Sequence, residues 1–344
     1  MFNISDRKSE HLKICINEDV SFNEKANGFD NYDFQHYAST EIDFTKIDTS
    51  LIFLNKKISF PFFISCMTGG TREAERINEK LAVVAKELNI PIGVGSQRQV
   101  LENSEFTSTY KTIRKNAGIV PVLGNIGASQ IVKSRNAVED VKKMAGMIEA
   151  DGMVIHLNPL QELMQKEGET DFWGLKKIIG KICNKTSSPI IIKEVGAGIS
   201  KKVAKEFLEL GVSGIDVAGA GGTSWAKVEM KRSGNEDDFV ADWGLPTSYC
   251  VKKIRKLKKK YNFLLIASGG INHYSETAKS IVLGADISAS ARNVLQVLMN
   301  NETEGLLNYL KEWFENVRKI MFLTNSNNLE EFHNIRLIKK EKLF

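Results

Sequence analysis

Residues 189–220 read PIIIKEVGAGISKKVAKEFLELGVSGIDVAGA, and the repeating unit of the chain is visible in this stretch. Its first seven residues form a run that is apolar apart from Lys193 and Glu194 and shows no polar alternation, as in a strand that is covered on both faces. Residues 201–211 then place apolar side chains three and four positions apart, which is typical of an amphipathic helix. A second apolar run occupies 214–220. Two buried strands joined by such a helix indicate a βαβ unit with parallel strands.

The same unit recurs along the whole chain. Eight short apolar runs are separated by amphipathic stretches, which is compatible with a closed barrel or with a doubly wound sheet. Nearly every run ends in polar residues, as in barrels, where the active site is assembled at the carboxyl ends of the strands. We therefore predict an α/β fold, a (β/α)8 TIM barrel with an N-terminal extension. The runs are residues 61–67, 90–96, 119–125, 152–158, 189–195, 214–220, 263–270 and 285–291.

The chain divides into two parts on this interpretation. Residues 1–60 precede the first strand and are expected to form an N-terminal extension with a short hairpin that caps or flanks the barrel. Residues 61–344 are expected to form the barrel as a single domain. The long connection 219–246 is predicted to be a lid or a disordered segment, because structureless loops of this length are uncommon inside compact domains.

Composition limits the function further. The chain has 344 residues, a formal net charge of +5 and 42% hydrophobic residues, which suits a globular protein with an anionic small-molecule substrate. It has no basic stripe of the kind that nucleic-acid-binding proteins present. Four widely separated cysteines and the absence of a long apolar segment favour a cytoplasmic protein without a membrane partner.

Glycine-rich turns follow several of the predicted strands. MTGGT at 67–71, GAGGT at 219–223, SGGI at 268–271 and GAD at 284–286 let backbone N–H groups approach a ligand closely. In barrels, the turns after strands seven and eight commonly form a phosphate site together with a helix amino end. The last two motifs therefore indicate the phosphate cradle of flavin mononucleotide (FMN). The alternative is that these glycines only allow tight helix–strand packing.

Ionisable and amide side chains end three other strands. Lys193 ends an apolar run and is expected to face the electron-rich N1–C2=O edge of a flavin, although a salt bridge to Glu194 or Asp216 is the alternative. HLNPLQE at 156–162 puts an imidazole, amides and a carboxylate at one rim, where Glu162 could hold Mg²⁺. His156 alone is equally compatible with a structural role.

A cationic clamp is predicted at the end of the second strand. GSQR at 95–98 ends in Arg98, whose guanidinium suits two-point contact with phosphate. With Arg7 and Lys8 from the N-terminal segment, it would bind a second phosphate group, distinct from that of the flavin.

Taken together, RKSEH, MTGG, GSQR, GNIGA, HLNPLQE, IIKEVGAG, GAGGTSW, SGGI and GAD resemble the type II isopentenyl-diphosphate isomerases over residues 7 to about 295. This resemblance implies a 1,3-allylic proton shift between isopentenyl and dimethylallyl diphosphate, with reduced FMN and Mg²⁺ as cofactors and NADPH as reductant. It also implies a homo-oligomer, a tetramer or an octamer. One departure is Ala218, where many members have a serine that touches the flavin.

The resemblance also implies the site residues. Those expected to hold FMN are Cys66, Met67, Thr68, Ser96, Asn125, Lys193, Thr223, Gly269, Gly270, Ile271, Ala291 and Arg292. Those expected to contact the substrate are Arg7, Lys8, Ser96, Gln97, Arg98, His156, Asn158 and Gln161, and Glu162 is the expected metal ligand.

The catalytic candidates, among the positions that the resemblance implies, are Gln161, His156 and Lys193. An alkene is a poor base, so its protonation needs a strong acid held against the double bond. The strand ends offer no pair of carboxylates for this work. We therefore hypothesise that reduced FMN is the acid–base group and that Gln161 orients the substrate.

Two other functions remain as alternatives. An FMN-dependent 2-hydroxy acid oxidase shares the barrel and cradle, but it needs an Arg and a His at the ends of strands six and seven, where this chain has VAGAGGTSW and ASGGI. The chain could also be a flavin-binding sensor without turnover, which only an activity measurement distinguishes from an enzyme.

Overall fold

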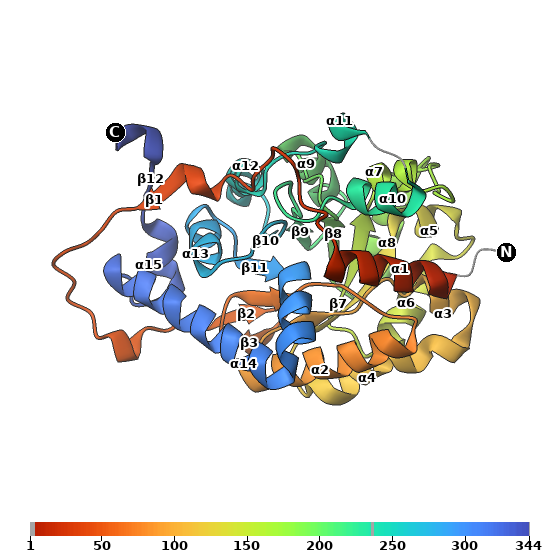
Figure 1. The fold of residues 1–344 in the computed structure, drawn as a ribbon, viewed down its shortest axis with the longest axis horizontal. Helices are drawn as coiled ribbons and strands as arrows, with labels where there is room; N and C mark the ends of the chain where they lie inside the picture. The colour runs from red at the N-terminus through yellow and green to blue at the C-terminus, as the bar shows by residue number, and fades with distance from the viewer. Residues whose placement is uncertain (1–3, 235–236, 344) are drawn as a thin grey trace.

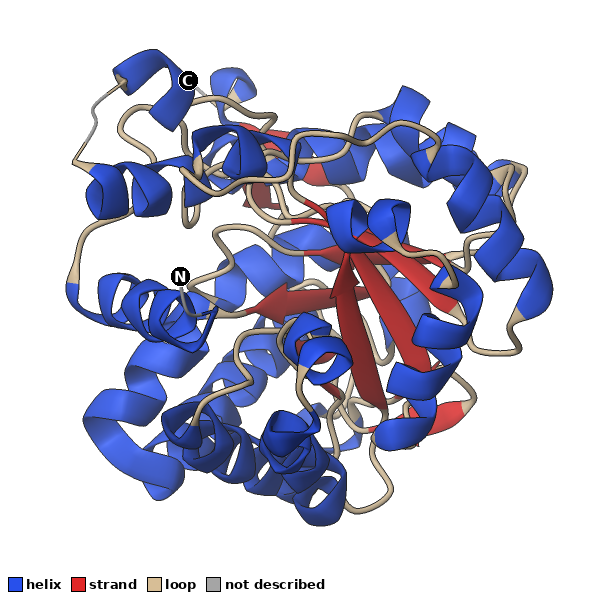
Figure 2. Ribbon diagram, turned by 90° about the vertical axis from the view of Figure 1, so that its right-hand side faces the viewer, coloured by secondary structure: helices blue, strands red, loops and turns tan. Residues whose placement is uncertain are grey.

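The computed structural model describes residues 4–234 and 237–343. Eight strands close into a barrel in the order β10-β11-β4-β5-β6-β7-β8-β9, and every neighbouring pair is parallel. Figure 2 shows the strands at the centre with helices around them. The TIM-barrel prediction is confirmed, and each predicted run overlaps one strand. The strands are β4 (Phe62–Ile64), β5 (Ile92–Gly93), β6 (Val122–Gly127), β7 (Gly152–Leu157), β8 (Ile190–Glu194), β9 (Gly214–Asp216), β10 (Leu264–Ala267) and β11 (Ile287–Ser290).

Helices cover the outside of the barrel and its carboxyl-end rim. Their bounds are α1 (Ile4–Asn17), α2 (Arg72–Leu88), α3 (Arg98–Glu102), α4 (Ser108–Ala117), α5 (Ala128–Lys133), α6 (Ala137–Met147), α7 (Pro159–Met164), α8 (Leu175–Lys185), α9 (Lys201–Leu208), α10 (Trp225–Ser233), α11 (Asp238–Ala241), α12 (Thr247–Ile254), α13 (Tyr274–Val282), α14 (Arg292–Leu323) and α15 (Leu329–Asn334). In the described part of the chain, none of them combines the length and apolar character needed to cross a membrane.

The local sequence explains why these helices form, and α2 is a clear case. The Thr71 hydroxyl accepts a hydrogen bond from the Ala74 N–H at 3.0 Å and so caps the amino end. Ile77 and Leu81 lie on the buried face. The helix ends at Asn89, which adopts the left-handed conformation with φ 49°. A capped, amphipathic helix of this kind packs its apolar face onto the sheet.

A hairpin closes the amino end of the barrel. Strands β2 (Leu51–Phe53) and β3 (Lys56–Ile58) pair antiparallel, as predicted for the N-terminal extension. Phe53 and Ile58 pack against the side chains that fill the barrel, among them Phe63 and Ile191. Burial of apolar area of this kind stabilises a fold by roughly 25 cal/mol per Å². The barrel therefore has a packed floor, and its open end is the opposite, carboxyl-end rim.

The rest of the extension wraps around the barrel. Figure 1 shows α1, in dark red, lying across the rim near α10, while β1 (Tyr32–Phe34) runs beside the blue C-terminal β12 (Leu337–Lys339). The two strands pair antiparallel. Residues far apart in the sequence thus meet, and α1 is placed where ligands enter the barrel.

The connection 219–246 contains two helices, α10 and α11, so the described part of it is not a structureless loop. Helix α10 begins at Trp225, where the Ser224 side chain accepts a hydrogen bond from the Lys227 N–H at 3.3 Å, and it ends at Gly234. It contacts α7 and α1. The connection therefore forms part of the wall of the site.

Candidate functional site

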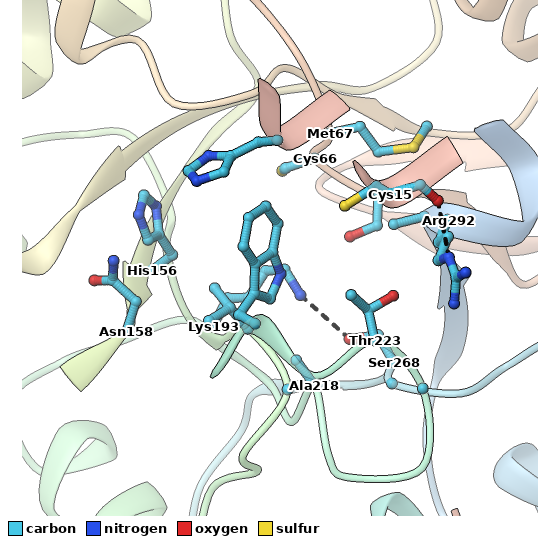
Figure 3. Close-up of a pocket in the computed structure, with 18 of the residues that line it drawn as sticks. Cys15, Cys66, Met67, His156, Asn158, Lys193, Ala218, Thr223, Ser268 and Arg292 are labelled. Carbon is cyan, nitrogen blue, oxygen red and sulfur yellow. Dashed lines mark hydrogen bonds between the residues drawn. The ribbon is translucent and has the colours of Figure 1, made fainter. Parts of the chain in front are cut away.

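A cavity of about 650 Å³ opens at the carboxyl ends of the strands. This volume lies in the usual range of ligand sites and leaves room for more than a single small group. The predicted site residues that line it are Arg7, Lys8, Cys66, Met67, Thr68, Ser96, Arg98, Asn125, His156, Asn158, Gln161, Glu162, Lys193, Thr223, Gly269, Gly270, Ile271, Ala291 and Arg292. In Figure 3, His156 and Asn158 lie on one side of the opening and Arg292 on the other.

Lys193 lies at the bottom of this cavity and has a charged partner. Its register neighbour on β9 is Asp216, and Lys193 Nζ lies 3.2 Å from Asp216 Oδ2. Lys193 also donates to Ser268 Oγ at 3.3 Å (Figure 3). Ser268 in turn donates to Asp216 Oδ1. The salt bridge of Lys193 to Asp216 is therefore compatible with the prediction that Lys193 faces a flavin, because the ammonium group is paired and still lines the cavity.

The glycine-rich turns at 219–223 and 268–271 meet at another part of the cavity wall. A Cβ on Gly222 would lie 2.3 Å from the Gly270 nitrogen, and one on Gly269 would lie 2.1 Å from the Gly219 oxygen. Gly269 also has a φ of +95°. Only glycine allows the two backbones to approach so closely at these positions.

Helix α14 begins beside these turns. No side chain caps its amino end at Ala291, so its first N–H groups are available to an acceptor in the cavity. Ala291 and the turn at 269–271 all line the cavity. These features fit the phosphate end of a nucleotide.

Arg292 lines the cavity but holds the N-terminal segment. Its guanidinium donates to the Cys15 carbonyl at 2.9 Å (Figure 3). It also donates to the Glu18 carbonyl at 2.6 Å and to Ser21 Oγ at 3.2 Å. These contacts fasten the end of α1 to the start of α14. The arginine thus links the phosphate side of the cavity to the helix that carries Arg7 and Lys8.

His156 is held in its neutral form. Its Nδ1 lies 2.8 Å from Asn125 Oδ1 on the neighbouring strand β6. Burial, with the nearby Lys193 and Lys8 ammonium groups, lowers the pKa of His156 from 6.5 to about 4. The imidazole is therefore uncharged near neutral pH, and because Nδ1 donates to Asn125, its Nε2 is left as a hydrogen-bond acceptor.

This depressed pKa gives a stability prediction. The stability contributed by neutral His156 should be present above pH 6.5 and be lost as the pH falls through about 4, because only the unfolded chain takes up the proton readily in between. The loss should be of order 2 kcal/mol. Urea unfolding of the wild-type chain and of His156→Gln at pH 7 and pH 4.5 checks this. The variant should lose less stability between the two pH values, and equal losses would contradict the depressed pKa.

Glu162 is a buried carboxylate with fixed oxygens. Oε1 accepts from Ser129 Oγ at 3.2 Å and from Asn158 Nδ2 at 3.0 Å, and Oε2 accepts from the Glu169 N–H at 2.8 Å. Asn158 Oδ1 is buried without a hydrogen-bond partner. A carboxylate and an unpartnered amide oxygen at the cavity wall are oxygen ligands of the kind that Mg²⁺ prefers. Among the described residues, no group of three or more His, Cys, Asp or Glu could hold a metal ion.

Three cationic side chains lie at the same wall. Lys8 Nζ donates to the Gly69 carbonyl at 2.9 Å and to the Ser96 carbonyl at 3.0 Å, which draws α1 onto the strand ends. Burial and the neighbouring Arg98 lower the pKa of Arg7. Charges forced this close together provide a strong attraction for a polyanion.

Gln161 is oriented by a carboxylate that the sequence interpretation missed. Its Nε2 donates to Glu229 Oε1 at 3.0 Å, and Oε1 accepts from Asn158 Nδ2 at 3.3 Å. Burial alone would raise the pKa of Glu229, but His11, Gln161 and Arg232 hold it below its ordinary value. Glu229 belongs to α10, as does its partner Arg232, but His11 comes from α1 and Gln161 from α7, so the local sequence does not mark Glu229 as part of the site.

Gln97 is the predicted contact that the structure moves away from the ligand. Among the predicted site residues, it alone does not line the cavity. Its fully buried amide accepts from the Asn125 N–H at 2.9 Å and donates to the Met144 carbonyl at 3.1 Å. The turn after β5 sends Ser96 and Arg98 into the cavity and Gln97 behind it, so we reassign Gln97 as a support for β6.

Fold and site together define a class of barrel enzyme. The model of the FMN-dependent dehydrogenase family matches residues 128–339. Solved structures agree at the level of the fold: a flavocytochrome b2 variant with sulfite bound has a TM-score of 0.71 at 16% identity, covering 96% of this chain and 82% of that one. A mandelate oxidase variant has a TM-score of 0.68 at 13% identity, covering 96% and 95%. The chain is thus a TIM barrel of the FMN-dependent dehydrogenase class.

Curated relatives narrow this class. An isopentenyl-diphosphate delta-isomerase of Chlorobium phaeobacteroides is 40% identical over 97% of this chain and 95% of its own length. One from a Nostoc species is 41% identical over 94% and 93%. The chain belongs to the isopentenyl-diphosphate delta-isomerase family of enzymes, and the resemblance inferred from the motifs is confirmed.

Proposed function

We propose that this enzyme interconverts isopentenyl and dimethylallyl diphosphate by a 1,3-allylic proton shift, with reduced FMN and Mg²⁺ bound. The observation that supports this most is that a single cavity carries two separate anion-binding ends. One is the glycine cradle at the start of α14, and the other is the wall formed by Arg7, Arg98 and Glu162. A nucleotide phosphate suits the first, and a metal-bound diphosphate suits the second.

The residues around the cradle fit FMN. The uncapped start of α14 suits the phosphate, and Ser65 Oγ is a buried hydroxyl without a hydrogen-bond partner at the cavity wall. Lys193 presents a cation at the bottom of the cavity, where it would stabilise negative charge on the ring. When bound in its reduced form, FMN supplies a proton donor at N5 and an electron-rich face that stabilises positive charge.

The other wall fits the substrate. Arg7 and Arg98 would bind the diphosphate. Neutral His156, whose Nδ1 donates to Asn125, would present an uncharged acceptor at Nε2, and the unpartnered Asn158 Oδ1 would be available to the bound metal. Gln161, fixed by Glu229 and Asn158, would hold the hydrocarbon portion so that its double bond faces the flavin side. Positioning of this kind supplies much of the rate enhancement in reactions without a strong protein acid.

Glu162 gives a test of the metal site. We expect Glu162→Gln to keep its hydrogen bonds from Ser129 and Asn158 but to lose the charge that holds Mg²⁺. The Mg²⁺ concentration for half-maximal turnover should rise by about 10-fold or more, within the 10- to 100-fold range seen when metal-site partners are removed. A Mg²⁺ titration of turnover measures this. An unchanged midpoint would exclude Glu162 as a metal ligand.

The second candidate function is oxidation of a 2-hydroxy acid, which the shared fold of mandelate oxidase favours. In the described chain, the cavity residues that follow β9 and β10 are Ala218, Gly221, Gly222, Thr223, Trp225, Ser268, Gly269, Gly270, Ile271 and Asn272, and none is an Arg or a His. We therefore expect isopentenyl diphosphate to be converted and mandelate or lactate to be left unchanged when they are supplied side by side. Oxidation of the hydroxy acid would favour the oxidase, and flavin binding without any turnover would favour a sensor.

We further propose NADPH as the reductant, a homo-oligomeric assembly of four or eight chains, and a cytoplasmic location. The motif resemblance supports the first two. Exposed aromatic side chains such as Trp173 and Phe239 are compatible with chain–chain contacts. Four unpaired cysteines suit a reducing compartment.

A further inference from the structure

Glu169 lies beside the cationic wall and neutralises part of it. Its Oε1 lies 2.9 Å from Arg98 Nη2 and 3.3 Å from Lys133 Nζ. Its Oε2 accepts from Gln130 Nε2 at 3.1 Å. The Glu169 side chain is only 14% exposed, so water screens these interactions weakly. The arginine best placed to bind a diphosphate is thus already paired with a carboxylate.

Glu169 is also hydrogen-bonded to Glu162, the candidate metal ligand. The Glu169 N–H donates to Glu162 Oε2 at 2.8 Å. The preceding residue, Gly168, packs so tightly that a Cβ there would lie 1.7 Å from the Glu162 carbonyl oxygen. The turn at 165–169 therefore fixes two carboxylates, Glu162 and Glu169, in one small region of the wall.

This arrangement lowers the net positive charge of the wall. The Glu169 carboxylate pairs with Arg98 and Lys133, and the charges of Glu162 and Glu229 act on Arg7. A metal-free diphosphate that approaches Arg98 meets the Glu169 carboxylate on the same guanidinium and Glu162 close by, and like charges repel. A divalent cation held at Glu162 offsets that repulsion, because it neutralises part of the anion and of the wall together.

We infer that Glu169 is a specificity-determining residue that makes diphosphate binding depend on an accompanying divalent cation. It does so as a resident counter-ion of Arg98, without contacting the reacting atoms. This inference rests on the proposed function, since it concerns the same diphosphate site. Glu169 would discriminate between the metal–diphosphate complex and the free diphosphate anion. This role is separate from binding either of them.

The test measures binding rather than turnover. Inorganic pyrophosphate is titrated calorimetrically into the full-length protein supplied with FMN, once with Mg²⁺ and once with a chelator. The quantity compared is the ratio of the two affinities. In Glu169→Gln, metal-free pyrophosphate should bind about 10-fold more tightly than in the wild type, and the Mg²⁺ enhancement should shrink by the same factor, or ~1.4 kcal/mol.

Glu167→Gln is the matched control. It removes one carboxylate from the same turn, and Glu167 pairs with Arg232 Nη2 at 3.4 Å instead of with Arg98. Its Mg²⁺ enhancement should equal that of the wild type. Glu169→Ser provides a second variant that removes the charge but keeps the N–H bonded to Glu162, in case the glutamine variant folds poorly.

The outcomes distinguish failure of the inference about Glu169 from failure of the proposed function. An unchanged enhancement ratio in both Glu169 variants would overturn the inference while the diphosphate site stands. Equal weakening with and without Mg²⁺ would also overturn it, since this is the result of a purely structural role. If the wild type fails to bind pyrophosphate even with Mg²⁺, the diphosphate site itself is wrong and the proposed function fails with it.

Discussion

Replacing Lys193 with methionine is expected to destabilise the folded chain by about 3–5 kcal/mol and to abolish turnover. The substitution leaves the Asp216 carboxylate, fully buried inside the barrel, without its cation 3.2 Å away. It also removes the charge that faces the flavin side of the cavity. Urea unfolding measures the first effect, and flavin fluorescence and product formation measure the second.

The double variant Lys193→Met/Asp216→Asn separates these two effects. It removes both charges, so most of the lost stability should return, while flavin affinity and turnover should stay low. Full activity in the double variant would show that Lys193 serves only as the partner of Asp216. A single variant as stable as the wild type would contradict a stabilising ion pair between Lys193 and Asp216.

Gln161→Ala should lower kcat by about 100-fold, at the lower end of the range for groups that position or transfer a proton. The amide is held between Glu229 and Asn158, and alanine has nothing to orient the substrate against the flavin side. Pyrophosphate and flavin affinity should change little, because the residue lies on α7 away from the cradle. Steady-state kinetics with the flavin kept reduced measures this. Full turnover would remove Gln161 from the mechanism.

The barrel could be predicted from the sequence because its signal is local. Strands such as 190–194 are buried on both faces, and each is followed by a helix with its own apolar stripe. The cavity residues could be predicted for the same reason, since the end of a parallel strand fixes which rim its next residues join. Lys193 shows the limit of this reasoning, because its partner Asp216 lies on a neighbouring strand.

The features that were missed depend on contacts between distant segments. Glu229 and Glu169 look like ordinary helix and turn carboxylates until α1, α5 and α7 bring their partners to them. The pairing of β1 with β12 joins opposite ends of the chain. Gln97 was misplaced because the tight turn after β5 alternates its side chains between cavity and core, and periodicity does not specify that turn.

The redox requirement of the isomerisation is the most direct test of the proposed function. Purified protein receives FMN, Mg²⁺ and isopentenyl diphosphate without oxygen, and one sample is reduced with dithionite while the other keeps oxidised flavin. Dimethylallyl diphosphate should form in the reduced sample alone, because the proton donor is present only there. Equal product in both samples, or in a sample without flavin, would contradict the role assigned to the cofactor and to the residues that hold it.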